Sequence, residues 1–117
     1  MTVTLAVMSG VLAAVFLGSG GAKLAGAASM RKSADHLGLS FQNFRLVGVA
    51  EVAGAVGLLI GLAVKPLGVA AAIGLFLTMA GAVVYHRRAS DSVGETLPAA
   101  VIALVAAALA VLFAQSM

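Results

Sequence analysis

Four long apolar stretches constrain this chain more than any other feature of its sequence. Each is about 20 residues long and contains few ionisable side chains. A helix of about 20 apolar residues crosses the hydrocarbon core of a bilayer. A segment surrounded by lipid must satisfy its own backbone hydrogen bonds, which makes each stretch helical. The sequence therefore predicts one all-α membrane domain over residues 1–117, a four-transmembrane-helix bundle with helices at about 3–24, 44–64, 67–86 and 97–114.

The composition identifies lipid as the main surroundings of the chain. Hydrophobic residues make up 62% of it and charged residues 9%, against about 45–50% and about 25% in soluble domains. The net charge of +3 does not indicate nucleic acid, because the basic residues lie at the ends of apolar runs instead of forming an aromatic-rich patch. The chain has no cysteine, which excludes disulfides, thiolate chemistry and Cys-ligated metals.

The links between the apolar stretches predict the orientation in the membrane. Residues 65–66 form a tight connection, whereas residues 25–43 and 87–96 form longer polar links, and residues 29–37 are suited to a short interfacial helix. Basic residues mark the cytoplasmic side of a membrane protein. Both long links are expected in the cytoplasm and both termini outside the cell membrane, because six of the seven basic residues flank those links: Lys23, Arg31, Lys32, Arg45, Arg87 and Arg88.

Pairs of small residues four positions apart suggest close contacts between helices. Gly57 and Gly61 form one such pair, and Gly10 and Gly18 begin two others, with Ala14 and Ala22. In a chain with 14 glycines such pairs also arise by chance. Together they predict a tightly packed bundle without showing which pair is a contact.

Glu51 is the most informative single residue because it lies about two turns inside the second apolar stretch. An ionisable group at that depth costs a few kcal/mol unless it is protonated or has a partner, so it is expected to face the bundle interior. A functional acid/base group is one interpretation. A structural residue that snorkels to the interface or forms one hydrogen bond is the other.

Four further residues are expected in the same leaflet as Glu51, because successive helices alternate in direction: Lys23, Arg45, Tyr85 and His86. Arg45 lies six positions from Glu51 on the same helix, so Lys23 or His86 is the better partner for the carboxylate. A carboxylate beside a cation can act as a base, and His or Tyr can act as an acid. Alternatively, the basic residues snorkel to headgroups and His86 interacts with a helix C-terminus.

Other polar residues give weaker signals. His36 follows Asp35 directly, which is not metal-ligand spacing, and two histidines without cysteine predict no metal site. Ser9, Ser19 and Thr78 are expected to bond to the backbone of their own helices.

The order of these motifs resembles the DoxX-like family of small four-helix membrane proteins. The first helix ends in Gly20-Gly21-Ala22-Lys23-Leu24, and the third ends in Ala82-Val83-Val84-Tyr85-His86. The second carries the most specific part, the glycines and polar residues of the run from Phe44 to Leu58. By position, the family's polar motif residues are Lys23, Arg45, Glu51 and His86.

The resemblance implies a membrane subunit associated with redox chemistry, because the family is named after a subunit of a thiosulfate:quinone oxidoreductase. Other relatives are linked to membrane-associated oxidative-stress complexes. A quinone or another lipophilic small molecule is then the expected ligand, with a protein partner or a homo-oligomer as further expectations. The residues leave open a small enzyme doing acid/base chemistry, of the isomerase or epoxide-opening type, a non-catalytic scaffold, and a transporter.

Overall fold

The computed structural model describes residues 2–117 as five helices. Four of them are long and apolar enough to cross a membrane, which confirms the predicted all-α membrane bundle and makes the chain a multi-pass membrane protein. The fifth helix, α2, is short and lies in the first long link. The helices are α1 (Thr2–Ala25), α2 (Ala28–Leu37), α3 (Phe41–Gly61), α4 (Lys65–Arg88) and α5 (Val93–Gln115).

Helix caps explain where the observed ends differ from the expected ones. α3 begins three residues before the expected start, because the Ser40 side chain accepts a hydrogen bond from the Asn43 backbone N–H. α5 begins at Val93 because Ser92 and Glu95 form a capping box. At the other ends, Gly26 and Gly38 take a positive φ of 74° directly after α1 and α2, a conformation that glycine adopts without steric cost.

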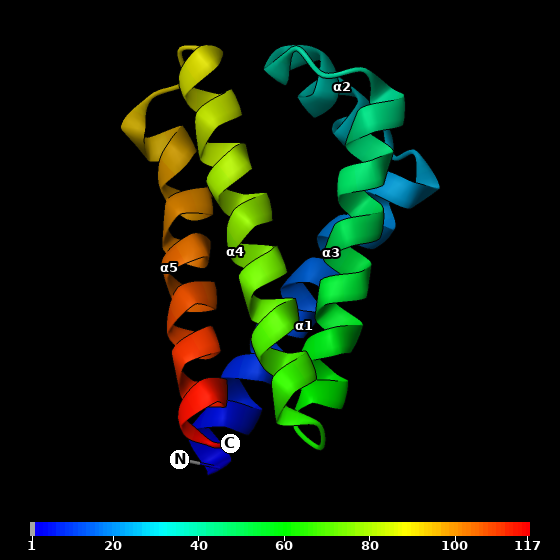
Figure 1. Ribbon diagram of the computed structural model, residues 1–117. Helices are drawn as coiled ribbons and strands as arrows, with labels where there is room; N and C mark the ends of the chain where they lie inside the picture. The colour runs from blue at the N-terminus through cyan, green and yellow to red at the C-terminus, as the bar shows by residue number, and fades with distance from the viewer. Residues whose placement is uncertain (1) are drawn as a thin grey trace.

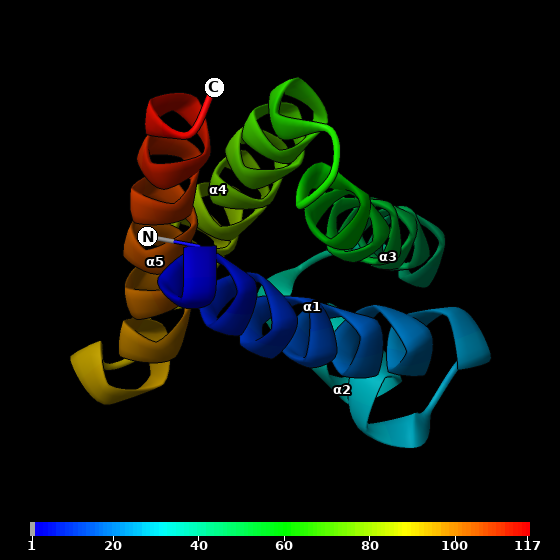
Figure 2. The same ribbon diagram turned by 90° about the horizontal axis from the view of Figure 1, so that it is seen from below.

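The long helices form two pairs that diverge toward one end of the molecule (Figure 1). α1 packs against α3, α4 packs against α5, and α3 joins the two pairs through its contact with α4. The short α3–α4 connection lies at the same end as the start of α1 and the end of α5, and α2 lies at the opposite end. The view from below in Figure 2 shows the four long helices in the order α5, α4, α3, α1. Both long links therefore lie on one side of the bundle.

The hydrophobic core lies mainly in the half of the bundle that holds the termini. Its largest fully buried members are Phe16, Phe113, Leu5, Leu58 and Leu75. They come from the beginning and middle of α1, the first half of α4 and the last part of α3 and α5. The opposite half, where the helix pairs diverge, is packed less completely and contains a cavity.

The glycine contacts show which small-residue pair joins helices. A Cβ atom on Gly57 would lie 2.8 Å from the Ala71 side chain, and one on Gly61 would lie 2.4 Å from the Gly68 backbone. A Cβ atom on Gly10 or Gly18 would meet nothing within 4 Å. The Gly57–Gly61 pair is thus a true contact between α3 and α4. Gly10 and Gly18 make no close contact with another helix.

Candidate functional site

The carboxylate of Glu51 is buried against two side chains of α1. The Lys23 ammonium lies 2.7 Å from Oε1 of Glu51, and the Ser19 hydroxyl donates to Oε2 at 3.2 Å. Lys23 also donates to the Ser19 hydroxyl at 2.7 Å. Glu51 is only 1% exposed and Lys23 only 7%. The expected partnership of Glu51 with a basic residue of a neighbouring helix is confirmed for Lys23.

Helix geometry brings these three groups together. Side chains on a helix lean toward its N-terminus, so the Lys23 side chain reaches back over Ser19, one turn earlier in α1. α3 runs in the opposite direction, so Glu51 leans toward the end of the bundle from which Lys23 comes. The ring of Phe44, one turn from the start of α3, lies 4.9 Å from the ammonium and supplies a cation–π contact.

Two glycines allow α1 and α3 to approach closely enough for this contact. A Cβ atom on Gly20 would lie 2.8 Å from the Gly48 carbonyl oxygen, and one on Gly48 would lie 2.8 Å from Cβ of Lys23. Such distances leave no room for a side chain at either position. The motif glycines therefore position the ion pair, since larger residues would push the two helices apart.

A cavity of about 760 Å³ lies beside the ion pair, between the diverging helix pairs. Most of its lining is apolar and comes from all five helices. Leu46 of α3 and Leu77 of α4 belong to the lining although they are 60% and 62% exposed. The cavity thus extends to the outer surface of the spanning helices, where lipid lies. Its polar lining comprises Ser19, Lys23, Ser33, Asn43, Glu51, Thr78, Tyr85 and His86.

The five site residues predicted from the sequence do not all meet. Glu51 and Lys23 form the ion pair, and Tyr85 and His86 line the same cavity from α4. Arg45 does not line the cavity. Its guanidinium donates instead to the Leu24 carbonyl oxygen at 3.2 Å, at the C-terminal end of α1, where carbonyl groups lack partners within the helix.

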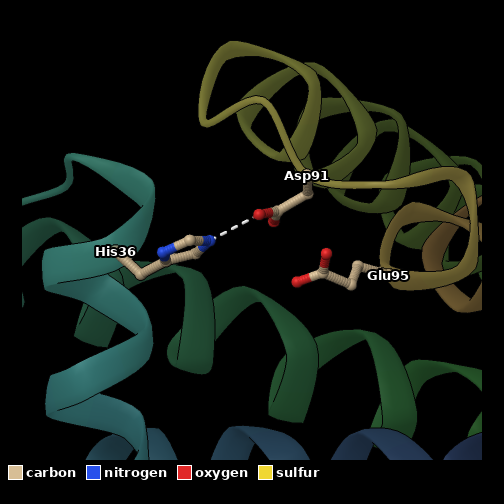
Figure 3. Close-up of side chains that lie close together, drawn as sticks. All are labelled: His36, Asp91 and Glu95. Carbon is tan, nitrogen blue, oxygen red and sulfur yellow. Dashed lines mark hydrogen bonds and ion pairs between the residues drawn. The ribbon is translucent and has the colours of Figure 1, made fainter.

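A second polar cluster joins α2 to the α4–α5 link. Asp91 accepts from Nε2 of His36 at 2.5 Å and from Nδ1 of His86 at 2.6 Å, as Figure 3 shows for His36. Its side chain is only 4% exposed. The hydrogen bond from His86, followed by the one from His36, lowers the pKa of the Asp91 carboxyl, because both bonds favour the ionised form.

Sequence reasoning missed Ser19 and Asp91. The expectation that Ser9 and Ser19 bond to the backbone of their own helices is wrong: Ser19 donates to Glu51, and the buried Ser9 hydroxyl has no hydrogen-bond partner within residues 2–117. Thr78 does bond to the Gly74 carbonyl oxygen. The spacing of four residues between Ser19 and Lys23 was a signal for the first. For Asp91 the signal was topological: both long links lie at one end, so their charged residues can meet.

The family comparison covers the part of the chain that holds these residues. The sequence model of the DoxX-like family matches residues 7–109, which include the ion pair, the cavity lining and the second polar cluster. No curated protein and no solved structure matches the chain. Because the family model covers most of the chain, this small multi-pass membrane protein belongs to the DoxX-like family.

Proposed function

We propose that the protein binds a lipophilic molecule with a polar head, of the quinone class, in the cavity beside Glu51, and serves as a redox-associated membrane subunit. The observation that carries this proposal is the buried Lys23–Glu51 pair on the wall of an apolar cavity that reaches the lipid-facing surface. Ligand sites combine apolar walls with a few convergent polar groups in this way. The proposed redox association rests on the family, which is named after a subunit of a thiosulfate:quinone oxidoreductase.

The polar lining suits the head of a quinone. The Lys23 ammonium can donate to a quinone carbonyl oxygen, and Tyr85 and His86 offer hydrogen-bonding groups from α4. Reduction of a quinone to a quinol takes up two electrons and two protons. Glu51 and the α4 residues are the proposed proton carriers, and a partner protein is the proposed source of electrons.

A second candidate is acid/base catalysis on a lipophilic substrate, of the isomerase or epoxide-opening type. It is favoured by the presence of a carboxylate on α3 and of an imidazole and a phenol on α4 around one cavity. In that reaction Glu51 would accept a proton and Tyr85 or His86 would donate one. In the alternative of a non-catalytic scaffold, Glu51 would only hold α3 against α1 through its contacts with Lys23 and Ser19.

The proposed orientation places the cavity in the cytoplasmic half of the membrane. Six of the seven basic residues lie at the end of the bundle that holds both long links, which favours the cytoplasm for that end. Both termini are then extracytoplasmic, and a soluble partner would approach the long links.

The Gly81→Leu variant tests occupancy of the cavity. Gly81 lines the cavity, and a Cβ atom there would meet nothing within 4 Å, so the leucine side chain is expected to enter the cavity without disturbing the helices. We expect the affinity for decylubiquinone to fall at least tenfold, measured by calorimetric titration in detergent micelles.

Gly74→Leu is the matched control, because Gly74 lies two turns earlier in α4, has the same open surroundings and does not line the cavity. Decylbenzene, which lacks the carbonyl groups, serves as the control ligand. Equal quinone affinity in Gly81→Leu and Gly74→Leu, or equal binding of decylbenzene and quinone, would contradict the proposal.

The Glu51→Gln variant separates proton transfer from a structural role. Glutamine is similar in size and can still bond to Ser19 and Lys23, but its amide does not gain and lose a proton as a carboxyl group does. General acid–base groups contribute about 10²–10⁴-fold to rates. We therefore expect quinone reduction, measured in native membranes that carry the variant in place of the wild-type chain, to fall at least tenfold, while quinone affinity changes less than threefold. An unchanged rate would contradict proton transfer by Glu51 and would indicate that this residue only stabilises the contact between α1 and α3.

A further inference from the structure

The second polar cluster contains side chains whose nitrogen and oxygen atoms could bind a metal ion. Glu95, in the first turn of α5, joins His36 and Asp91 there, and one potential ligand atom from each of the three residues lies within 4.8 Å of the others. Figure 3 shows the imidazole and the two carboxylates facing a common space. The three groups come from α2, the α4–α5 link and α5, so only the tertiary structure assembles them.

We propose that His36, Asp91 and Glu95 form a binding site for a divalent transition-metal ion such as Zn²⁺, which binds imidazole nitrogen and carboxylate oxygen. Zinc takes nitrogen and oxygen ligands at about 2.0–2.2 Å, which separates tetrahedral ligand atoms by about 3.4 Å. The spacings here, from 2.5 Å between Nε2 of His36 and Asp91 to the outer bound of 4.8 Å, bracket that value. Small side-chain rotations are sufficient to reach it.

The charges in the cluster also suit a divalent ion. Two carboxylates and a neutral imidazole balance a charge of +2. The ion would replace the proton through which Nε2 of His36 now bonds to Asp91. That proton would move to Nδ1 of the same ring or to water, and the fourth coordination position would hold water, as in zinc sites with three protein ligands.

The surroundings orient two of the proposed ligands. His86 donates from Nδ1 to the other oxygen of Asp91 at 2.6 Å, which is the outer-shell support that metal-bound carboxylates usually have. Glu95 is held by its capping box, in which Oε1 accepts from the Ser92 backbone N–H at 3.2 Å. His36 is 54% exposed on its side chain, so an ion can reach the site from water.

Metal binding would link α2 to the α4–α5 connection. α2 contributes Met30, Ser33 and Leu37 to the lining of the larger cavity, so the ion would hold one wall of that cavity in place. The metal site itself does not depend on which ligand the larger cavity takes, and its test needs no quinone.

The test is titration of ZnCl₂ into the purified full chain in detergent micelles, after removal of any histidine tag, followed by calorimetry and by the thermal unfolding midpoint. We expect one ion per chain, micromolar affinity and a higher midpoint with zinc.

Two variants each remove one proposed ligand. Glu95→Gln keeps an oxygen for the capping box but loses the carboxylate, and His36→Ala changes a side chain that is half exposed. Both variants should fold and bind zinc at least tenfold more weakly. His86→Ala, which removes outer-shell support, should lose about 10–100-fold.

Asp35→Asn is the matched control, because Asp35 is an exposed acid next to His36 that lies outside the cluster. Its zinc affinity should equal that of the unmodified chain. Absence of saturable binding below 1 mM zinc, or unchanged affinity in both His36→Ala and Glu95→Gln, would overturn the proposal.

Discussion

Lys23→Met is expected to lower the free energy of unfolding by about 3–5 kcal/mol, the cost typical of breaking a buried ion pair from one side. The substitution leaves the Glu51 carboxylate 1% exposed with the Ser19 hydroxyl as its remaining donor. A carboxylate without a counter-charge in such surroundings must either take up a proton or draw in water. Unfolding can be followed by circular dichroism as SDS is added to dodecylmaltoside micelles.

The double variant Lys23→Met/Glu51→Leu distinguishes loss of the pair from loss of packing. Replacing both members of a buried pair by apolar residues of similar size is often nearly neutral, so the double variant should be more stable than Lys23→Met alone. Lys32→Met, at an exposed position on α2, is the control and should change stability by less than about 0.5 kcal/mol. Glu51→Leu alone completes the comparison: if its effect and that of Lys23→Met simply add in the double variant, the ion pair contributes no coupling.

Gly61→Ala is expected to destabilise the bundle by about 1–3 kcal/mol, the usual cost of overpacking a well-packed contact. A Cβ atom at this position would lie 2.4 Å from Cα and 2.7 Å from N of Gly68. Because these are backbone atoms, no side-chain rotation relieves the clash, and α3 must move away from α4. The same SDS titration measures the loss.

Gly74→Ala provides the control for Gly61→Ala. A Cβ atom there meets nothing within 4 Å, and alanine has the higher helix propensity, so stability should be unchanged or slightly increased. Equal losses in the two alanine variants would contradict the proposal that the contact of α3 with α4 decides the effect at Gly61.

The sequence was sufficient for the architecture because the bilayer imposes one requirement on every span. Apolar length and backbone hydrogen bonding define four helices without reference to their packing, and alternating direction then places both long links at one end. Helix ends were less predictable. The capping box at Ser92 and Glu95 extends α5 by four residues before the expected start at Leu97, because local hydrogen bonds outweigh the polarity of that turn.

The cost of a lone carboxylate in lipid also made a buried partner for Glu51 predictable from the sequence. The choice of Lys23, the role of Ser19 and the exclusion of Arg45 from the cavity were decided by the tertiary structure. They depend on the distance and rotation of α1 against α3, which the Gly20–Gly48 crossing determines. The meeting of His36 with Asp91, 55 positions apart, likewise depends on how far the helix pairs diverge. The sequence determines which ionisable groups need a partner within the membrane. Only the packing of the helices determines which residues become those partners.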